Sequence, residues 1–585
     1  MRRHIVAALA AIFMLPASLP VQARSANPGG DPAGDNQSAA GNETSRYTVL
    51  YAKGASNAHA RKAITAAGAK LVTENAAVGV ATVKAGPDFL SQVAKQPALG
   101  GAARSRPIAK VPGAPAPKDD GIERYGNTAK VKAAPTKAQP RRAPTRRERY
   151  GGPQPGNDPL FDRQWDMAAI GAASWGSYAK QGGARRVIVS IIDSGIDGSH
   201  PDLAPNFNAR LSRNFTRDIP LIDGPCEYEN CKDPANVDHS GHGTHVAGTV
   251  GAKLNGIGLA GVAPNVMLVN ARAGQDGGYL FLQPVVDAIV YSADIGADVA
   301  NMSFYIDPWL YNCRDNPADS PEAQMEQRTI IKATQRAVDY ARSRGVTLVA
   351  SMGNGFTDVG NPEFDDSSPD YPPGAAYPRE VDNSCLRLPS EADGVIAVTA
   401  LGPSGRKSYY SDYGIEQADV SAPGSDAYDP GWFTDELSEP RRRVLSTYPE
   451  YVLRANGLLN PDGTPNDTLT VLKDGAYYRY LQGTSMSSPH AAGVAALIVS
   501  EYGHTDHRRK GRKHFGGLTL HPRRTERILL GTLTEQACPR PRLQTYPELP
   551  LDDPSPYNAR CEGSRSHNGF YGHGIVNAWK AVTGG

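Results

Sequence analysis

Short apolar runs punctuate the second half of the chain and predict buried strands. Residues 186–192 read RVIVSII and residues 346–350 read VTLVA. Runs of β-branched residues without polar alternation are typical of strands buried on both faces. Residues 483–497, GTSMSSPHAAGVAAL, instead predict a turn of small residues followed by an Ala-rich helix. Pro489 fits this helix because proline is tolerated in the first helical turn.

The pattern before residue 110 predicts a separate small module. A strand is expected at 47–51, a helix at 57–67, two strands within 71–83 around a turn at Val78-Gly79, and a second helix at 88–95. A β-α-β-β-α-β alternation of this length suggests a ferredoxin-like fold. Because the pattern is common, an unrelated accessory domain stays open as the alternative.

The chain begins with features of an exported protein. Residues 1–23 combine Arg2, Arg3, an apolar run and a small-residue end at Ala23, which predicts a cleaved signal peptide. Residues 24–45 are rich in Gly, Asn, Ser and Asp and predict a disordered spacer. Residues 111–156 are rich in Pro, Ala, Lys and Arg and predict an extended linker. No other stretch approaches eighteen apolar residues, so we expect no membrane span.

Charge and cysteine content narrow the class of protein further. The formal net charge of +2 gives no reason to expect a nucleic-acid partner. All six cysteines follow the linker, and an even number in an exported chain favours disulfides. Sequence proximity favours the pair Cys226–Cys231, whereas Cys313–Cys385 and Cys538–Cys561 are guesses among fifteen possible pairings. The cysteine spacings do not resemble a zinc site.

Three polar side chains lie where an α/β enzyme could use them. Ser485 precedes the Ala-rich helix, whose free N–H groups would face whatever the hydroxyl attacks. Asp193 follows the apolar run 186–192, and His242 lies in DHSGHGTH. Each has a plainer interpretation when taken alone: Ser485 as a helix N-cap and Asp193 as a turn residue. His242 and His245 could share a metal, but the HExxH arrangement of zinc proteases is absent.

Taken in chain order, the segments VSIIDSGID, DHSGHGTH and GTSMSSPH resemble the three active-site segments of the subtilisin-like serine proteases, in that family's order of acid, histidine and serine. The resemblance implies an α/β fold, with a mostly parallel sheet and helices on both faces, over residues 157–585. It also implies Ser485 as nucleophile, His242 as base and Asp193 as the orienting acid. His245 matches a structural histidine, and we expect His239 and His490 to be hydrogen-bonded neighbours.

The same resemblance extends to the groups around the substrate. Asn354, which follows the strand at 346–350, matches the family's side-chain donor to the oxyanion. The expected substrate-binding residues are Ser303, Phe304, Tyr305, Ser351 and Gly353. Where the family usually has Leu-Gly-Gly after Ser303, this chain has Phe304-Tyr305-Ile306, so the pocket shape cannot be carried over. A substrate should still pair as an added strand along this edge.

A calcium site is also implied by the resemblance. Oxygen ligands from side chains and loop carbonyls suit this hard cation. The loop at 254–259 is one residue shorter than the usual pattern, which leaves the exact ligands open; a simple surface loop is the alternative. The matching residues are Gln164, Asp202, Leu254, Asn255, Ile257 and Leu259.

We therefore expect a secreted serine endopeptidase, extracellular or periplasmic and monomeric, made as a pro-enzyme. Residues 46–110 would be its inhibitory pro-segment and the linker its processing region. Relative to the family, insertions are expected at about 307–328, 355–388, 426–480 and the basic 504–524, where polyanion binding is an alternative to a solvated surface. There are two rival functions. A non-catalytic secreted binding protein should have lost a catalytic residue, and a metalloprotease should carry a zinc motif, which this sequence lacks.

Overall fold

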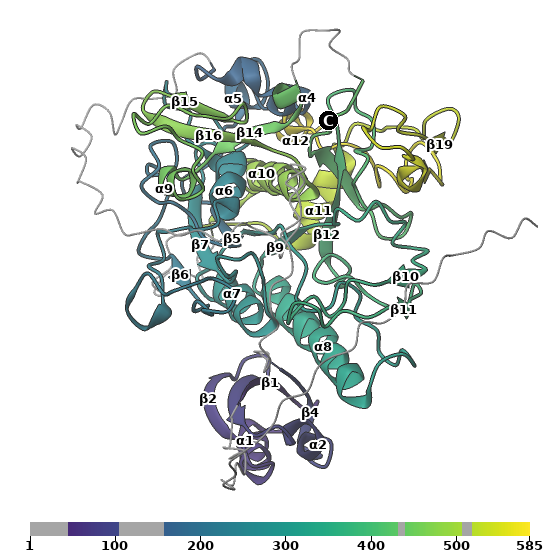
Figure 1. Cartoon of the computed structure of the whole chain (residues 1–585). Coiled ribbons are helices and arrows are strands. Elements are labelled where there is room, and N and C mark those ends of the chain that lie inside the picture. Colours follow the sequence, from purple (N-terminus) through teal and green to yellow (C-terminus); the bar gives the residue numbers. More distant parts are fainter. Residues whose placement is uncertain (1–44, 105–156, 431–438, 506–516) are drawn as a thin grey trace, which may run out of the picture. The chain divides into compact units, whose positions relative to one another are not determined.

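The computed structural model describes residues 45–104, 157–430, 439–505 and 517–585 (Figure 1). The predicted signal peptide, nearly all of the spacer and the whole linker therefore lie outside the described residues, as do parts of the insertions at 426–480 and 504–524. Within the described ranges, no helix is both long and apolar enough to cross a lipid bilayer.

The N-terminal module has the predicted β-α-β-β-α-β alternation. Its elements are β1 (Ser45–Tyr51), α1 (Asn57–Ala66), β2 (Lys70–Asn75), β3 (Val80–Ala85), α2 (Phe89–Val93) and β4 (Leu99–Arg104). The strand order is β2-β3-β1-β4, and each neighbouring pair is antiparallel. Ser56 caps α1 by accepting a hydrogen bond from the His59 N–H. This order and alternation are those of the expected ferredoxin-like fold.

A seven-stranded parallel sheet forms the centre of the larger domain (Figure 1). Its strands, in spatial order, are β13 (Val420–Pro423), β12 (Val395–Leu401), β9 (Thr347–Ser351), β8 (Val299–Met302), β5 (Ile188–Ile192), β7 (Met267–Arg272) and β6 (Arg213–Asn214). Each neighbouring pair is parallel. The two apolar runs that predicted buried strands are β5 and β9, and every residue of both strands is buried.

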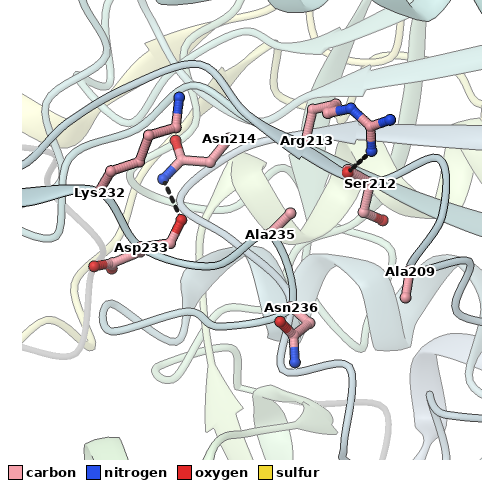
Figure 2. A pocket seen from close by; sticks show the side chains of 8 residues that line it. All are labelled: Ala209, Ser212, Arg213, Asn214, Lys232, Asp233, Ala235 and Asn236. Carbon is pink, nitrogen blue, oxygen red and sulfur yellow. Dashed lines mark hydrogen bonds between the residues drawn. The ribbon is translucent and has the colours of Figure 1, made fainter. Parts of the chain in front are cut away.

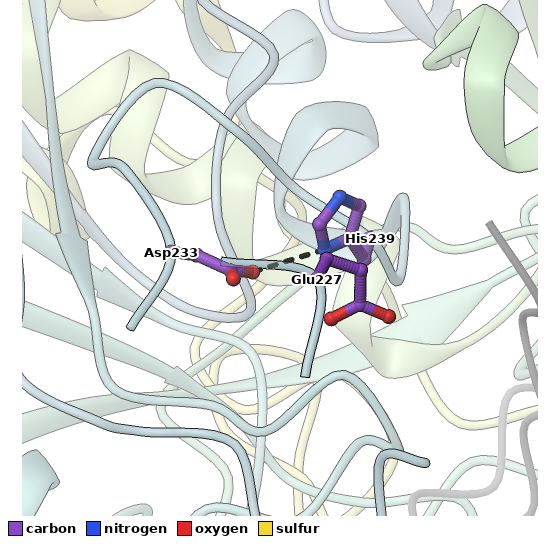
Figure 3. A group of neighbouring side chains, drawn as sticks. All are labelled: Glu227, Asp233 and His239. Atoms are coloured by element: carbon purple, nitrogen blue, oxygen red, sulfur yellow. Dashed lines mark ion pairs between the residues drawn. The ribbon is translucent and has the colours of Figure 1, made fainter. Parts of the chain in front are cut away.

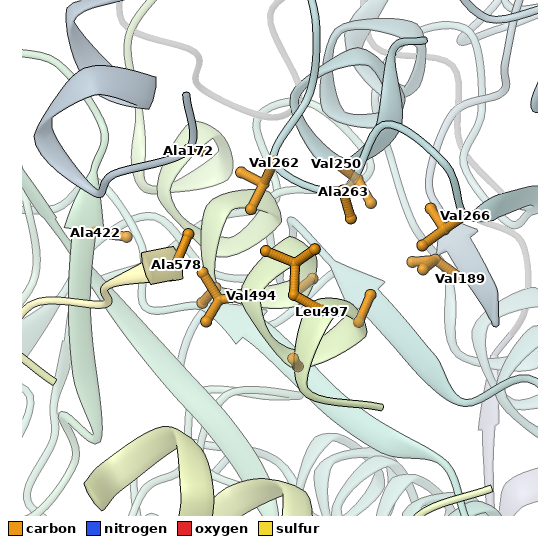
Figure 4. Packing of buried hydrophobic residues seen from close by; sticks show 14 of the residues in the cluster. Ala172, Val189, Val250, Val262, Ala263, Val266, Ala422, Val494, Leu497 and Ala578 are labelled. Atoms are coloured by element: carbon orange, nitrogen blue, oxygen red, sulfur yellow. The ribbon is translucent and has the colours of Figure 1, made fainter. Parts of the chain in front are cut away.

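Helices cover both faces of this sheet, as expected. One apolar core contains Val189 and Val349 together with residues of α6 (His242–Gly251), α10 (Thr484–Tyr502), α11 (Pro522–Gly531) and α12 (Ala578–Thr583). The opposite core contains Ile192 and Leu348 with residues of α7 (Leu282–Asp294) and α8 (Pro321–Ser343). Figure 4 shows Val494 and Leu497 of α10 among the labelled residues of the first core. Because α10 is buried from Thr484 to Val499, its N-terminus is fixed against the sheet.

Described residues of the insertion at 426–480 form a second, antiparallel sheet. It consists of β14 (Val444–Thr447), β15 (Thr470–Lys473) and β16 (Ala476–Leu481), with α9 (Glu450–Ala455) between the first two strands. The remaining short elements are α4 (Trp165–Ala169), α5 (Ser177–Lys180), β10 (Phe364–Asp365), β11 (Arg379–Glu380), β17 (His504–Thr505), β18 (Leu518–Thr519), β19 (Leu543–Gln544) and β20 (Ala559–Arg560).

All three predicted disulfides are present. They join Cys226 to Cys231, Cys313 to Cys385 and Cys538 to Cys561. The second disulfide links the insertion after β8 to the insertion after β9. It therefore ties together two segments that leave the carboxyl edge of adjacent strands.

Candidate active site

Asp193 and His242 meet at the carboxyl edge of the central sheet. Asp193 directly follows β5, and His242 is the first residue of α6. The distance between His242 Nδ1 and Asp193 Oδ1 is 2.6 Å, and both residues are buried. The Ser194 N–H donates to the same carboxylate oxygen at 2.7 Å. This carboxylate is therefore held in place and can fix the orientation of the imidazole ring.

The close approach of α6 to the segment after β5 depends on Gly243. A Cβ at this position would lie 2.2 Å from the Gly195 carbonyl oxygen, so only glycine fits. Asp238, to which the sequence assigned no role, secures the same turn. Its buried carboxylate accepts hydrogen bonds from Ser194 Oγ at 2.9 Å and from Thr244 Oγ1 at 2.6 Å. An Asp just before a helix is a common cap, but its bond across to Ser194 could not be predicted from the sequence.

Ser485 lies in the first turn of α10, next to the oxyanion donor predicted from the sequence. The Asn354 Oδ1 atom accepts hydrogen bonds from the Thr484 N–H at 2.8 Å and from Thr484 Oγ1 at 2.9 Å. A Cβ built on Gly483 would lie 3.3 Å from Asn354 Nδ2 and 3.7 Å from the Ser485 backbone nitrogen. Two donors therefore border one small space that glycine leaves open. This arrangement suits a developing oxyanion.

The expected substrate edge begins at Ser303, immediately after β8. The Ser303 hydroxyl donates to the Ser485 carbonyl at 2.9 Å, and the Ser485 hydroxyl donates to the Ser303 carbonyl at 3.2 Å. Ser488, one helical turn along α10, lies 2.7 Å from the Ser303 hydroxyl and was not expected in the site. Phe304 is 3% exposed and packs in the core, so its backbone is the part that lies along the edge.

The second expected substrate segment, Ser351 and Gly353, follows β9. The Gly353 N–H donates to Thr484 Oγ1 at 3.0 Å, which joins this segment to α10. Gly353 has a φ of +118°, and a Cβ there would lie 2.3 Å from an Asp412 carboxylate oxygen. Asp412 is itself paired with the buried Arg387. Thus an ion pair that the sequence did not predict lies directly against this segment.

The other histidines of the expected site each contact a buried neighbour. His245 Nε2 lies 3.0 Å from the Arg479 carbonyl oxygen, and burial lowers the pKa of His245 to about 3. His490 Nε2 lies 3.0 Å from Asp166 Oδ2. His239 Nδ1 lies 2.9 Å from Asp233 Oδ2. His245 is therefore neutral at ordinary pH, and all three rings are held by buried neighbours.

Most of the expected calcium ligands lie together. Asp202 accepts hydrogen bonds from Asn255 Nδ2 at 3.3 Å and from the Leu259 N–H at 3.1 Å. Gln164 donates to the Ala260 carbonyl at 3.0 Å, and its buried Oε1 has no hydrogen-bond partner among the described residues. Two further contacts here were not predicted from the sequence. Tyr478 donates to Asp202 at 2.7 Å, and Asp158 accepts from the Gly256 N–H at 2.7 Å. No described contact brings Leu254 into this set.

Acidic side chains also gather around His239 and Arg272. Glu227, Asp233 and His239 form one group that could hold a metal ion (Figure 3), and Asp218, Asp233 and Asp276 form another. Arg272 pairs with Asp233 at 2.6 Å and also with Asp276, so it already supplies positive charge to the second group. A cavity of about 400 Å³ borders Asp233, Asn214 and Lys232 (Figure 2).

Comparisons with known proteins agree with this geometry. The model of the "Subtilase family" matches residues 184–539. The chain is 30% identical over 314 residues to a thermophilic serine proteinase of Bacillus sp. (strain AK1), covering 54% of this chain and 52% of that protein. It is 29% identical over 366 residues to an extracellular protease of Xanthomonas campestris pv. campestris, covering 59% and 49%. The chain thus spans about half the length of these curated relatives.

A solved structure extends the likeness to the fold. The epidermin leader peptide processing serine protease from Staphylococcus aureus aligns with a TM-score of 0.57 at 21% identity. The alignment covers 92% of this chain and 98% of that one. At this low sequence identity, the likeness shows only a shared arrangement of helices and strands.

Proposed function

Because the chain belongs to the subtilase family, we propose that it is a serine endopeptidase that hydrolyses peptide bonds through an acyl-enzyme on Ser485. The observation that carries this proposal is the meeting of three features at one sheet edge. They are the buried Asp193–His242 pair, Ser485 at the start of α10, and the two donors beside Gly483. A non-catalytic binding protein remains the alternative, but every residue that the chemistry requires is present.

In the proposed reaction, Ser485 Oγ attacks the substrate carbonyl carbon while His242 takes the hydroxyl proton. In the structure, the Ser485 hydroxyl donates to the Ser303 carbonyl. Rotation about the Ser485 Cα–Cβ bond would therefore precede attack, and such rotations are fast on the timescale of turnover. Asp193 holds the imidazole and stabilises its protonated form. His242 then gives the proton to the leaving amine, and a water molecule, deprotonated by His242, releases the acyl group.

The negative charge of the tetrahedral intermediate would fall on its former carbonyl oxygen. Asn354 Nδ2 and the Ser485 N–H border the space beside Gly483 where this oxygen would lie. The two bonds that Asn354 Oδ1 accepts from Thr484 fix the amide group before the substrate arrives. Loss of one such donor typically costs about 3 kcal/mol of transition-state stabilisation.

The N-terminal module is proposed to be the inhibitory pro-segment. Hydrogen bonds join it to the surface helices of the larger domain. Arg336 of α8 donates to the Tyr51 carbonyl at 2.9 Å, and Asn75 donates to Asp287 of α7 at 3.2 Å. Secretion is proposed from the N-terminal sequence and from the likeness to the Xanthomonas relative, an extracellular protease. Self-cleavage would then fall within the linker.

Replacement of Ser485 tests the proposed nucleophile and the proposed self-processing together. The Ser485→Ala precursor, purified alone, should remain uncut and should not react with a serine-directed phosphonate. Ser500→Ala is the matched control, because its hydroxyl lies farther along α10, where it donates to the Ala496 carbonyl and accepts from the Ala184 N–H, and it contacts none of the proposed catalytic residues. The control should mature and react like the wild type. Phosphonate labelling of the Ser485→Ala protein would overturn the proposal.

We also propose a structural calcium ion at the loop 254–259. The unpartnered Gln164 Oε1 and the Asp202 carboxylate fit a hard cation, and Asn255 and the carbonyls of Ile257 and Leu259 would complete the ligands. When bound, the ion would cross-link this loop to the start of the domain. In the Ser485→Ala protein, removing calcium with a chelator should lower the melting temperature, and added calcium should restore it. Asp202→Asn should abolish this response, whereas an unchanged melting temperature in the parent would contradict the site.

A further inference from the structure

The segment after β8 changes its backbone partners after Tyr305. The Ile306 N–H donates to the Leu388 carbonyl at 2.8 Å, and the Asp307 N–H donates to the Leu280 carbonyl at 3.0 Å. For the N–H groups of Phe304 and Tyr305, no acceptor occurs among the residues that the structure describes. The edge is therefore available to an added strand only over Ser303–Tyr305, a length of about 10 Å.

Asp307 closes the far end of this edge. Its carboxylate accepts a hydrogen bond from the Leu280 N–H, and residues 281 and 307 form a parallel bridge. Asp307 is buried, at 1% exposure. The segment after β7 is thus joined directly to the segment after β8, in the place where a longer substrate strand would continue.

Aromatic side chains fill the space around this junction. We call Tyr279, Phe281 and Tyr371 the aromatic cluster. The ring centroid of Tyr371 lies 5.2 Å from that of Tyr279 and 5.8 Å from that of Phe281, both edge to face. All three residues are buried. Asp370, which precedes Tyr371, accepts a hydrogen bond from the Tyr305 hydroxyl at 2.6 Å, so the cluster is fixed to the last open residue of the edge.

We propose that the aromatic cluster ends the substrate-binding edge. Only about three substrate residues on the acyl side of the scissile bond then pair with the enzyme and raise kcat/KM. This inference rests on the proposed function. The acyl half of the substrate stays bonded to Ser485, whose hydroxyl lies against Ser303, so the segment that begins at Ser303 is the one placed to pair with it. Tyr371 and Tyr279 are then specificity-determining residues.

A length series of peptides tests the limit. Fluorogenic peptides with one fixed scissile bond would carry two to six residues on its acyl side, and kcat/KM would be measured for each. For the wild type, kcat/KM should rise up to the third residue and then change by less than about twofold. A rise that continues through six residues would overturn the proposal, whatever the variants do.

Two variants with a matched control identify the cause. Tyr371→Ala should make the fourth and fifth residues raise kcat/KM by about fivefold or more, because the new space accepts them. Tyr371→Phe keeps the ring and should behave like the wild type. Tyr305→Phe removes only the hydroxyl that fixes Asp370, so it should give a smaller gain. If Tyr371→Ala lowers kcat/KM equally at every length, the cluster is merely structural and the proposal fails.

A short ester with one acyl residue separates this proposal from the proposed function. It needs the catalytic groups but does not reach the cluster, so the wild type should hydrolyse it whatever the length series shows. If the wild type hydrolyses neither the ester nor any peptide, the proposed function fails. If the ester is hydrolysed but the length series shows no limit, only the inference fails.

Discussion

Two histidines three residues apart show how one side chain type takes two different roles. His242 lies against a single carboxylate, Asp193, at the sheet edge beside the start of α10. His239 lies 2.9 Å from Asp233 and 3.5 Å from Asp276, in a cluster centred on the buried Arg272. Both rings face buried acids. The number of acids, and what else pairs with them, distinguishes the two regions.

Charge explains the difference. Burial by itself would lower the pKa of His239, but the two adjacent carboxylates outweigh it and raise this pKa to about 10. Such a ring stays protonated at neutral pH and cannot act as a base there. Burial, followed by the nearby Asp233 and Asp276, raises the pKa of Asp218 to about 8, so this third carboxyl of the cluster is mostly protonated at neutral pH. His239 therefore serves as a fixed cation, and the proposed base is the other histidine, His242.

Activity should separate the two histidines most strongly. His242→Ala should lower turnover by about six orders of magnitude, the size of the loss in subtilisin, from which the estimate is taken. His239→Gln should keep turnover within about tenfold, because its ring is not needed for proton transfer. Steady-state kinetics on one peptide would measure both. Comparable losses in the two variants would mean that the cluster takes part in catalysis.

For the free energy of unfolding we expect the opposite order, with a larger effect from the cluster around Arg272 than from His242. Asp233→Asn removes the carboxylate shared by Arg272 and His239, and breaking a buried pair in this way typically costs about 3–5 kcal/mol of unfolding free energy. Asp366→Asn, at an exposed position, is the control and should change it by less than about 0.5 kcal/mol. Urea unfolding in the Ser485→Ala background would avoid self-digestion. A loss below 1 kcal/mol (about the value of a surface ion pair) would contradict the role given to the cluster.

Alkaline pH should remove part of this stabilisation. The pKa of His239 is raised in the folded state, so its contribution is complete below its ordinary value near 6.5 and is lost as pH rises through about 10. The difference in unfolding free energy between the parent and His239→Gln should therefore shrink between pH 7 and pH 11. Unfolding curves at several pH values would measure it. A difference that stays constant would show that His239 is not a folded-state cation.

The smallest loss of unfolding free energy is expected from removing the Cys226–Cys231 disulfide, which lies beside the cluster around Arg272. Cys226 and Cys231 are five residues apart, so replacing both by Ser should cost about 2 kcal/mol, because closing so short a loop removes little chain entropy. Cys313 and Cys385 are 72 residues apart, and their replacement should cost about 4 kcal/mol. Chemical unfolding of the two double variants would compare them. The reverse order would show that the Cys226–Cys231 loop supports the cluster by more than its length.

The sequence by itself determined the parts of the protein that depend on local pattern. The apolar runs at 186–192 and 346–350 predicted buried strands, and these strands are β5 and β9. The alternation before residue 110 determined the ferredoxin-like module. The segments around Asp193, His242 and Ser485 could be singled out because small residues and helix starts next to reactive groups are visible in a short stretch. Their resemblance to one family then set their expected roles.

Only the tertiary structure decided which distant residues meet. Arg272 and Asp233 are separated by 39 positions, and nothing local indicates that a guanidinium will be buried between carboxylates. The same holds for Tyr478 against Asp202 and for Tyr371 beside Tyr279, since each comes from an insertion without a recognisable pattern. Short-range propensity depends on neighbours along the chain, whereas ion pairs and the end of the substrate edge depend on packing between segments. That packing is fixed only when the sheet brings their ends together.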